Sequence, residues 1–454
     1  MKVNNFELAS LLSRVNLNQE EKDRILIGLN ERTENFEREV FFQYCKRWKL
    51  APLVYAQTIK YAWENHFNDN ILDQFKSHYE QAKTQNTNRN IRAVEFLTVF
   101  KEEGIDAIVL KGNYLAHQAY EEVGYKIMND FDILIRKEDW DRIQDVYLGL
   151  GYIPLGFGWS GEKEKPASFS HVGMTFISPD FTCIIGSQWG LKSPTTSYHV
   201  DIEDVWKTAK PFNLCGVNVK SLSTEYNLLH LILHMGIYKC GIRDCMDLYN
   251  LMRTDTIDES ELERLVHYAN AEQKTRFTMT LSNLCCPVFE EKLIDKIAVK
   301  PQGFLGRRLI RRLEVKESTK DFQSSYNDYF QDIEKKVIYF NLFPQFHLKL
   351  LFYMKIIGLI YFPETQVALK LNDKTHHPHF WNKCISKLKA PYFVFSLIAQ
   401  EIGWKFTILL FVKLFVDLIF SIKNYFVKSE SYFDYLKQRG VDPQDIENAV
   451  KKIQ

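Results

Sequence analysis

Apolar residues along the chain form helix-like stretches on both sides of a shorter segment with strand-like runs. In residues 1–95 they recur every three or four positions, and Gly and Pro are rare, which is typical of helices. Asn18 followed by Gln19-Glu20-Glu21 predicts the start of one helix, and residues 70–103 fit a single long helix. We therefore predict an N-terminal helical region over residues 1–95.

The strand-like runs begin after Gly104 and end near residue 222. Helix-like stretches lie between the first of them, so the order is strand, helix, strand, helix and then several strands. The predicted strands cover residues 105–110, 131–135, 169–178, 181–186 and 198–202, with a turn at Pro179-Asp180 joining the third and the fourth. This order predicts an α+β fold, in which a small mixed β-sheet core over residues 96–222 carries helices on one side.

The chain reads as helical again after this core. Ser223 is the predicted N-cap of a helix from Tyr226 to Lys239. We assign residues 223–315 to a helical domain and residues 316–454 to an aromatic-rich helical C-terminal region.

Residues 404–428 are the most apolar segment of the chain and are long enough to raise the question of membrane insertion. Lys405, Lys413 and Asp417 interrupt it, so no transmembrane segment is expected. The polar positions fall at spacings of three and four, which predicts a helix buried in the protein. The alternative is a peripheral contact with a membrane or a partner.

Composition narrows the class of protein. The 454 residues are 46% hydrophobic and 25% charged, an ordinary balance for a soluble protein with a sizeable core. The net charge of +1 gives no reason to expect a nucleic-acid partner. Eight cysteines without a Cys-x-x-Cys pair fit a reducing compartment, and the N-terminus lacks the apolar core of a signal peptide. We expect a cytoplasmic location.

Asp130-Phe131-Asp132 is the motif with the clearest chemistry. Residues i and i+2 of a strand face the same side, so two carboxylates would point to one place. Carboxylates this close repel each other unless a cation lies between them. Mg²⁺ or Mn²⁺ prefers such oxygen ligands and often shares them with substrate phosphates, which predicts a metal-dependent enzyme acting on a nucleotide. The alternative is a pair of acidic residues that simply face water.

Two further pieces complete the predicted site. Asp201, on the strand predicted at 198–202, would supply a third carboxylate for a second metal ion or act as a base. Glu203 shares its face and could replace it. Lys111 would place a positive charge near phosphate, and Gly112 would let the backbone approach it, although Gly112 also fits a plain turn.

Several runs resemble a known family. Ile108-Val109-Leu110-Lys111-Gly112, then residues 126–135 and Gly151-Tyr152, resemble the uncharacterised bacterial nucleotidyltransferase family of the polymerase-beta-like superfamily. Residues 200–206 resemble its Asp-Leu-His-Trp motif, with Glu203-Asp204 in place of the His, and residues 229–248 resemble its next helical segment. Lys126 stands where the family has Arg.

The resemblance implies roles for individual residues. The metal ligands and catalytic residues would be Asp130, Asp132 and Asp201, and the phosphate-binding residues Lys111, Gly112 and Lys126. The reaction would move a nucleoside monophosphate from an NTP to an unknown acceptor with Mg²⁺ or Mn²⁺ as cofactor.

Two other functions remain open from the sequence. One is a nucleotide-sugar-dependent glycosyltransferase, whose Asp-x-Asp would hold the metal. The other is a catalytically degenerate protein that binds nucleotide or serves as a scaffold. His230 and His234 share a helix face at a spacing that can bind zinc. Leu231 stands where the metalloprotease motif needs Glu, so we expect packed histidines, with a polar lining of the site as the alternative.

Overall fold

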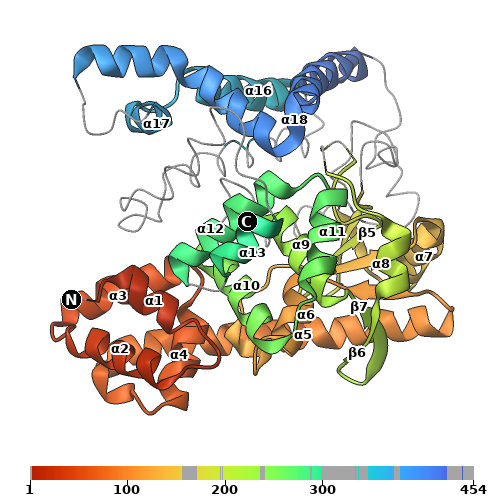
Figure 1. Ribbon diagram of the computed structural model, residues 1–454. Coiled ribbons are helices and arrows are strands. Elements are labelled where there is room, and N and C mark those ends of the chain that lie inside the picture. The colour runs from red at the N-terminus through yellow and green to blue at the C-terminus, as the bar shows by residue number, and fades with distance from the viewer. Residues whose placement is uncertain are drawn as a thin grey trace.

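The computed structural model describes residues 3–155, 171–194, 196, 198–235, 241–286, 289–297, 333, 336, 346–372, 379–426 and 442. The chain opens with the helices α1 (Asn5–Leu11), α2 (Gln19–Asn30), α3 (Asn35–Arg47) and α4 (Ala51–Lys60), followed by the 34-residue α5 (Asp69–Glu102) (Figure 1). The predicted helix start is confirmed, because Asn18 and Glu21 form a reciprocal capping box at α2. The single long helix predicted at 70–103 is also confirmed.

A seven-stranded mixed sheet follows α5. Its strands are β1 (Ala107–Val109), β2 (Phe131–Ile135), β3 (Ile153–Leu155), β4 (Thr175–Ile177), β5 (Ile184–Gln188), β6 (Lys210–Leu214) and β7 (Val217–Ser221). They lie in the order β3-β4-β5-β2-β1-β7-β6. β2 runs antiparallel to β1 and parallel to β5, whereas β1 runs parallel to β7. The mixed sheet and the hairpin across Pro179-Asp180 are confirmed.

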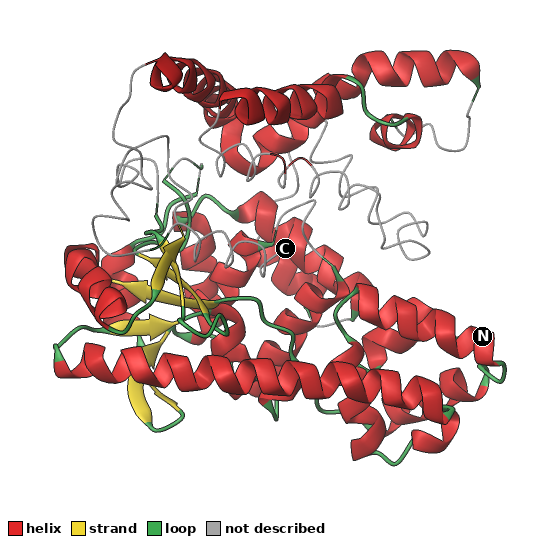
Figure 2. Cartoon of the chain, turned by 180° about the vertical axis from the view of Figure 1, so that it is seen from behind, coloured by secondary structure: helices red, strands yellow, loops and turns green. Residues whose placement is uncertain are grey.

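Helices cover both faces of this sheet, so the prediction of helices on one side is wrong. The reason is that side chains on both faces of β2 are buried, since all five of its residues are buried. Phe131, Ile133 and Ile135 pack with residues of α5 and of α7 (Trp140–Gly149). Leu134 packs on the opposite side, in a cluster that includes residues of α8 (Ile202–Thr208) and α9 (Thr224–His234). Figure 2 shows α5 crossing the strands.

Of two further local predictions in this region, one is wrong and one is confirmed. Residues 198–202 form no strand, because Asp201 instead caps α8. Ser223 does cap α9, as predicted, by accepting a hydrogen bond from the Tyr226 N–H. The helices that follow are α10 (Ile242–Thr254), α11 (Glu259–Tyr268), α12 (Glu272–Cys285) and α13 (Glu291–Ile297).

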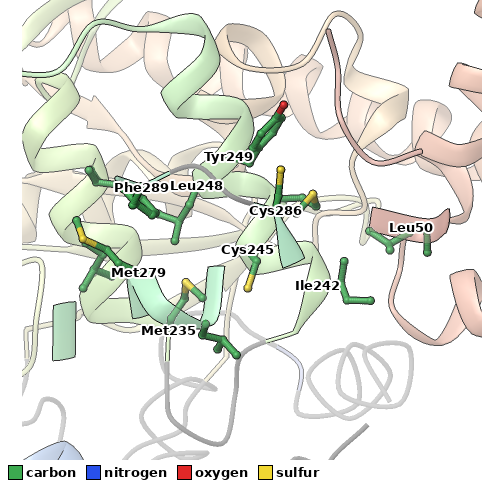
Figure 3. Close-up of a cluster of buried hydrophobic side chains, with 14 of the residues drawn as sticks. Leu50, Met235, Ile242, Cys245, Leu248, Tyr249, Met279, Cys286 and Phe289 are labelled. Atoms are coloured by element: carbon green, nitrogen blue, oxygen red, sulfur yellow. The ribbon is translucent and has the colours of Figure 1, made fainter. Parts of the chain in front are cut away.

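One hydrophobic cluster joins the N-terminal helices to the helices after the sheet. Figure 3 shows Leu50, at the start of α4, beside Ile242 and Cys245 of α10 and Cys286 after α12. All four are buried. Burial of such side chains is the main favourable contribution to folding. The division into four domains stays a prediction, but the first and third of these regions share this core.

The C-terminal helices α16 (Phe346–Tyr361), α17 (Thr365–Leu371) and α18 (Phe380–Phe426) have a separate core (blue in Figure 1). Leu414 and Leu418 of α18 are buried in it, while Trp404, Ile408 and Val412 are exposed. Within the described part of the chain, no helix combines the length and the apolar character that crossing a membrane requires. The side chains of Asp417, Ser421 and Asn424, as well as Lys428, lie outside the described residues.

Candidate active site

Lys111 and Asp132 form the centre of the candidate site. Lys111 is the first residue of α6 (Lys111–Gln118), directly after β1, and its Nζ lies 2.8 Å from Oδ2 of Asp132 on β2. Its backbone has a φ of 49°, in the left-handed region that side-chain-bearing residues rarely adopt. Such strain persists only where the surrounding structure maintains it, and it is common at functional sites. Burial alone would lower the pKa of Lys111, but the charges of Asp132 and Asp130 outweigh it and raise this pKa.

Asp130 lies just before β2 and brings a second carboxylate to this place. Its side chain reaches solvent, yet the surrounding protein displaces enough water to disfavour the charged form. This desolvation, together with the negative charge of Asp132, raises the pKa of Asp130 to about 6, against the opposing effects of Lys111 and Arg89. Lys111 therefore neutralises only part of the negative charge of the two carboxylates.

Helix α5 holds the segment that leads into β2. The Asn86 side-chain amide donates to the carbonyls of Val123 (2.6 Å) and Lys126 (2.7 Å). Arg89 donates to Asn86 Oδ1 (2.6 Å) and to the Met128 carbonyl (3.2 Å). Asn86 and Arg89 are both buried. Buried hydrogen bonds of this kind fix the backbone, so α5 holds the segment that directly precedes Asp130.

Lys126, predicted to contact phosphate, is buried in an ion pair. Its Nζ lies 2.6 Å from Oδ1 of Asp247 on α10, and the Tyr120 hydroxyl donates to the same oxygen at 2.6 Å. Burial lowers the pKa of Lys126, opposed by the charge of Asp247. A contact between Lys126 and phosphate would break its pair with Asp247. The phosphate role of Lys126 stays a prediction that no contact supports.

Gly112 has a packing reason to be glycine. A Cβ atom there would lie 3.3 Å from the Lys126 Cε and from the Met128 side chain. The close approach therefore brings α6 against the segment before β2. A larger residue here would require these neighbours to shift by a few tenths of an ångström, and the predicted approach of Gly112 to phosphate stays a prediction.

Two further basic groups lie near Lys111 and Asp130. His230 on α9 is buried, and desolvation together with the charges of Lys111 and His234 holds its pKa well below the usual range. Lys49, at the end of α3, is close enough for the charge of Asp130 to affect its pKa, which burial lowers. His230 is thus a packed histidine that also borders the site.

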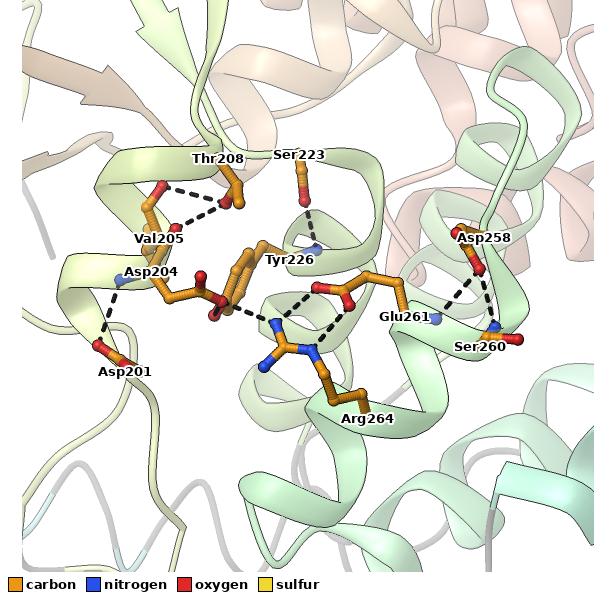
Figure 4. Close-up of polar contacts among 10 residues, drawn as sticks. All are labelled: Asp201, Asp204, Val205, Thr208, Ser223, Tyr226, Asp258, Ser260, Glu261 and Arg264. Atoms are coloured by element: carbon orange, nitrogen blue, oxygen red, sulfur yellow. Dashed lines mark hydrogen bonds and ion pairs between the residues drawn. The ribbon is translucent and has the colours of Figure 1, made fainter.

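Asp201 is the N-cap residue of α8. Figure 4 shows it at the start of α8, where its Oδ1 accepts from the N–H groups of Glu203 (3.1 Å) and Asp204 (3.2 Å). Asp204 in turn accepts from the Tyr226 hydroxyl (2.7 Å) and from Arg264 (2.8 Å). These contacts join α8 to α9 and α11. The predicted role of Asp201 as a metal ligand or base has no support in these contacts.

Glu203, the residue proposed as a substitute for Asp201, is also paired elsewhere. Its carboxylate lies 3.0 Å from Arg136, which follows β2. Glu203 is therefore engaged in a surface ion pair. Its partner Arg136 follows the last residue of β2, whereas Asp130 precedes the first.

The chemistry of the remaining donors fits a divalent cation. Mg²⁺ commonly binds through one or two carboxylates and completes its shell with water and substrate phosphates. Asp130 and Asp132 supply such carboxylates, and a cation bound there would relieve the repulsion between their negative charges. Over the described residues, no three His, Cys, Asp or Glu side chains gather into a complete metal-binding cluster. Water, or the substrate phosphates when they are present, would thus have to complete the shell.

A mixed sheet with one carboxylate on a central strand and another just before that strand, beside a lysine at a strand-to-helix turn, is an arrangement suited to nucleotidyl transfer. The chain belongs to a family of uncharacterised nucleotidyltransferases, whose sequence profile matches residues 34–287, more than half of the chain. The match includes Lys111, Asp130, Asp132 and α5. The resemblance is thereby confirmed for a nucleotidyltransferase family, while the bacterial origin and the wider superfamily stay predictions. Comparison with curated proteins finds no match.

Sequence reasoning missed several residues that build the site. Asn86 and Arg89 act across long sequence separations, which no local pattern reveals. Gly186 on β5 was also missed, although an isolated Gly within a strand signals a close approach of another group.

Proposed function

We propose that the protein is a cytoplasmic nucleotidyltransferase that uses Mg²⁺ or Mn²⁺ to transfer a nucleoside monophosphate from an NTP to an acceptor. Membership of the family supports the reaction type. The observation that carries the metal-dependent part is the pair of carboxylates at Asp130 and Asp132, only partly neutralised by Lys111. Their oxygen donors match the preference of these ions.

The proposed reaction assigns tasks to the residues of the site. An acceptor oxygen attacks the α-phosphorus, the bond from that phosphorus to the oxygen of the β-phosphate breaks, and pyrophosphate and the acceptor proton are released. Asp130 and Asp132 would hold the divalent cation, which neutralises the phosphates. Lys111 would hold Asp132 in place and add positive charge near the phosphates. Asn86 and Arg89 would fix the backbone of Asp130.

The two alternatives from the sequence gain nothing from the comparisons. A glycosyltransferase would consume a nucleotide sugar, and a degenerate protein would bind an NTP without releasing pyrophosphate. The family match favours neither of them.

Pyrophosphate release from each of the four NTPs, with a set of hydroxyl and phosphate acceptors and with Mg²⁺, tests the proposal. We expect turnover by the wild-type chain and its loss in Asp132→Asn, which removes one carboxylate charge. Asp106→Asn is the control, because Asp106 lies in a surface ion pair with Lys220. Consumption of a nucleotide sugar, or full activity of Asp132→Asn, would contradict the proposal.

We also propose that α18 contacts a membrane surface peripherally, in the segment predicted at 404–428. The exposed apolar side chains recur at spacings of three and four: Trp404, Ile408, Val412, Phe415, Ile419 and Ile422. α18 carries six lysines and two carboxylates, a net charge of +4. A helix that combines an apolar stripe with positive charge is suited to the interface of an anionic bilayer.

A further inference from the structure

The strand beside Asp132 contributes no carboxylate to the site. β5 pairs with β2 in parallel, with Gly186 opposite Asp132 and Gln188 opposite Leu134. Paired residues face the same side of a sheet, so the β5 residues on the Asp132 face are Ile184, Gly186 and Gln188. A two-cation site needs carboxylates that reach both ions, which lie about 3.5–4 Å apart. The face of β5 that lies beside Asp132 supplies no carboxylate.

The Asp132 side chain occupies the space that a side chain on β5 would need. A Cβ atom on Gly186 would lie 2.4 Å from Oδ1 of Asp132. Real atoms do not approach so closely, so any other residue at position 186 would displace this carboxylate. Gly186 thus allows the observed orientation of Asp132.

The second oxygen of Asp132 is already occupied by a positive charge. The Lys111 Nζ lies 2.8 Å from Oδ2, and the side chains of both residues are mostly buried. A carboxylate that bridges two metal ions commonly gives one oxygen to each ion. Here a fixed ammonium group stands at one of them, and it would repel a second divalent cation.

We propose that this site holds a single divalent cation and that the ammonium group of Lys111 takes the place of the second one, an arrangement that requires glycine at position 186. This inference rests on the proposed function and adds the number of cations and the positioning roles of Lys111 and Gly186. The lysine keeps its charge on every turnover, so only one metal ion has to be bound.

The number of ions is measured by titrating the full-length protein with Mn²⁺ alone and following free Mn²⁺ by electron paramagnetic resonance. We expect one Mn²⁺ per wild-type chain. Two bound ions would overturn the single-cation inference and leave the proposed function standing. The absence of any bound Mn²⁺ would instead remove the metal-dependent part of the proposed function, and this inference with it.

Lys111→Met tests the role of the ammonium group. It frees Oδ2 of Asp132, and we expect the Mn²⁺ dissociation constant to fall by about tenfold because a competing positive charge is gone. Lys220→Met is the matched control, since Lys220 forms a similar pair with Asp106 at 2.7 Å on the surface. An unchanged Mn²⁺ affinity in Lys111→Met would refute the role of Lys111.

Gly186→Ala tests the space beside Asp132. The added Cβ would displace the carboxylate, and we expect Mn²⁺ binding to weaken by about tenfold or more, with the fold checked by circular dichroism. Gly149→Ala on α7 is the control, because a Cβ there meets nothing within 4 Å. Wild-type Mn²⁺ affinity in a folded Gly186→Ala variant would contradict the role of Gly186, and Lys111→Met still tests the inference if this variant does not fold.

Discussion

At the scale of single residues, the raised pKa of Asp130 has a consequence for stability. The folded protein holds the Asp130 proton more firmly than the unfolded chain does, since the pKa rises from its usual value to about 6. The stability that this proton contributes is therefore fully present at low pH, and it is lost as the pH rises through about 6. Asp130→Asn should remove this loss and raise stability at pH 7.5 by on the order of 1 kcal/mol, a value reduced for the exposure of the side chain.

Urea unfolding of both proteins at pH 4.5 and pH 7.5 checks this expectation. Asp145→Asn, at an exposed position on α7, serves as the control. If Asp130→Asn is less stable than the wild type at pH 7.5, the charge of Asp130 is compensated by its neighbours, and the expectation is wrong.

The buried Lys126–Asp247 pair predicts a larger effect. Asp247→Asn leaves Lys126 buried without its negatively charged partner, and such changes cost about 3–5 kcal/mol. Asp106→Asn breaks the comparable exposed pair with Lys220 and should cost less than about 1 kcal/mol. Denaturant unfolding measures both values. Equal costs for the two variants would mean that Lys126 finds another partner.

At the scale of elements, the exposed stripe of α18 predicts binding to anionic membranes. Replacing Trp404, Ile408 and Val412 by Ser removes its apolar contacts, while Ile91→Ser on α5 is a control at another exposed apolar position. The wild type and the control should sediment with vesicles that contain phosphatidylserine, and the triple variant should remain in the supernatant. Equal sedimentation of all three proteins would contradict the assignment of this surface.

Helix and strand elements differed in how well the sequence predicted them. The capping box at Asn18 and the length of α5 follow from local residues, and both are confirmed. The strand predicted at 198–202 is wrong because Asp201 caps α8, and this helix-start signal outweighs the alternation of residues. Asp201 followed by Glu203 and Asp204 is a helix-start pattern with acidic residues in the first turn, and it was the better signal.

At the scale of the whole molecule, the site depends on pairings that no local pattern contains. The Asp-x-Asp motif and Lys111 could be read from the sequence, and the structure brings them together. The position of Gly186 beside Asp132 could not be read from the sequence. It depends on the register between β2 and β5, which lie about fifty residues apart along the chain. The covering of both sheet faces likewise depends on tertiary packing rather than on element order.

The proposed function requires that Asp130 and Asp132 bind an NTP through a divalent cation. Isothermal titration calorimetry of ATP, CTP, GTP and UTP, with Mg²⁺ and with EDTA, tests it most directly in the wild type and in the double variant Asp130→Asn/Asp132→Asn. We predict that at least one NTP binds to the wild type only with Mg²⁺, and that the double variant binds it about a hundredfold more weakly. Equal affinity of the two proteins, or binding that is unaffected by EDTA, would contradict the account.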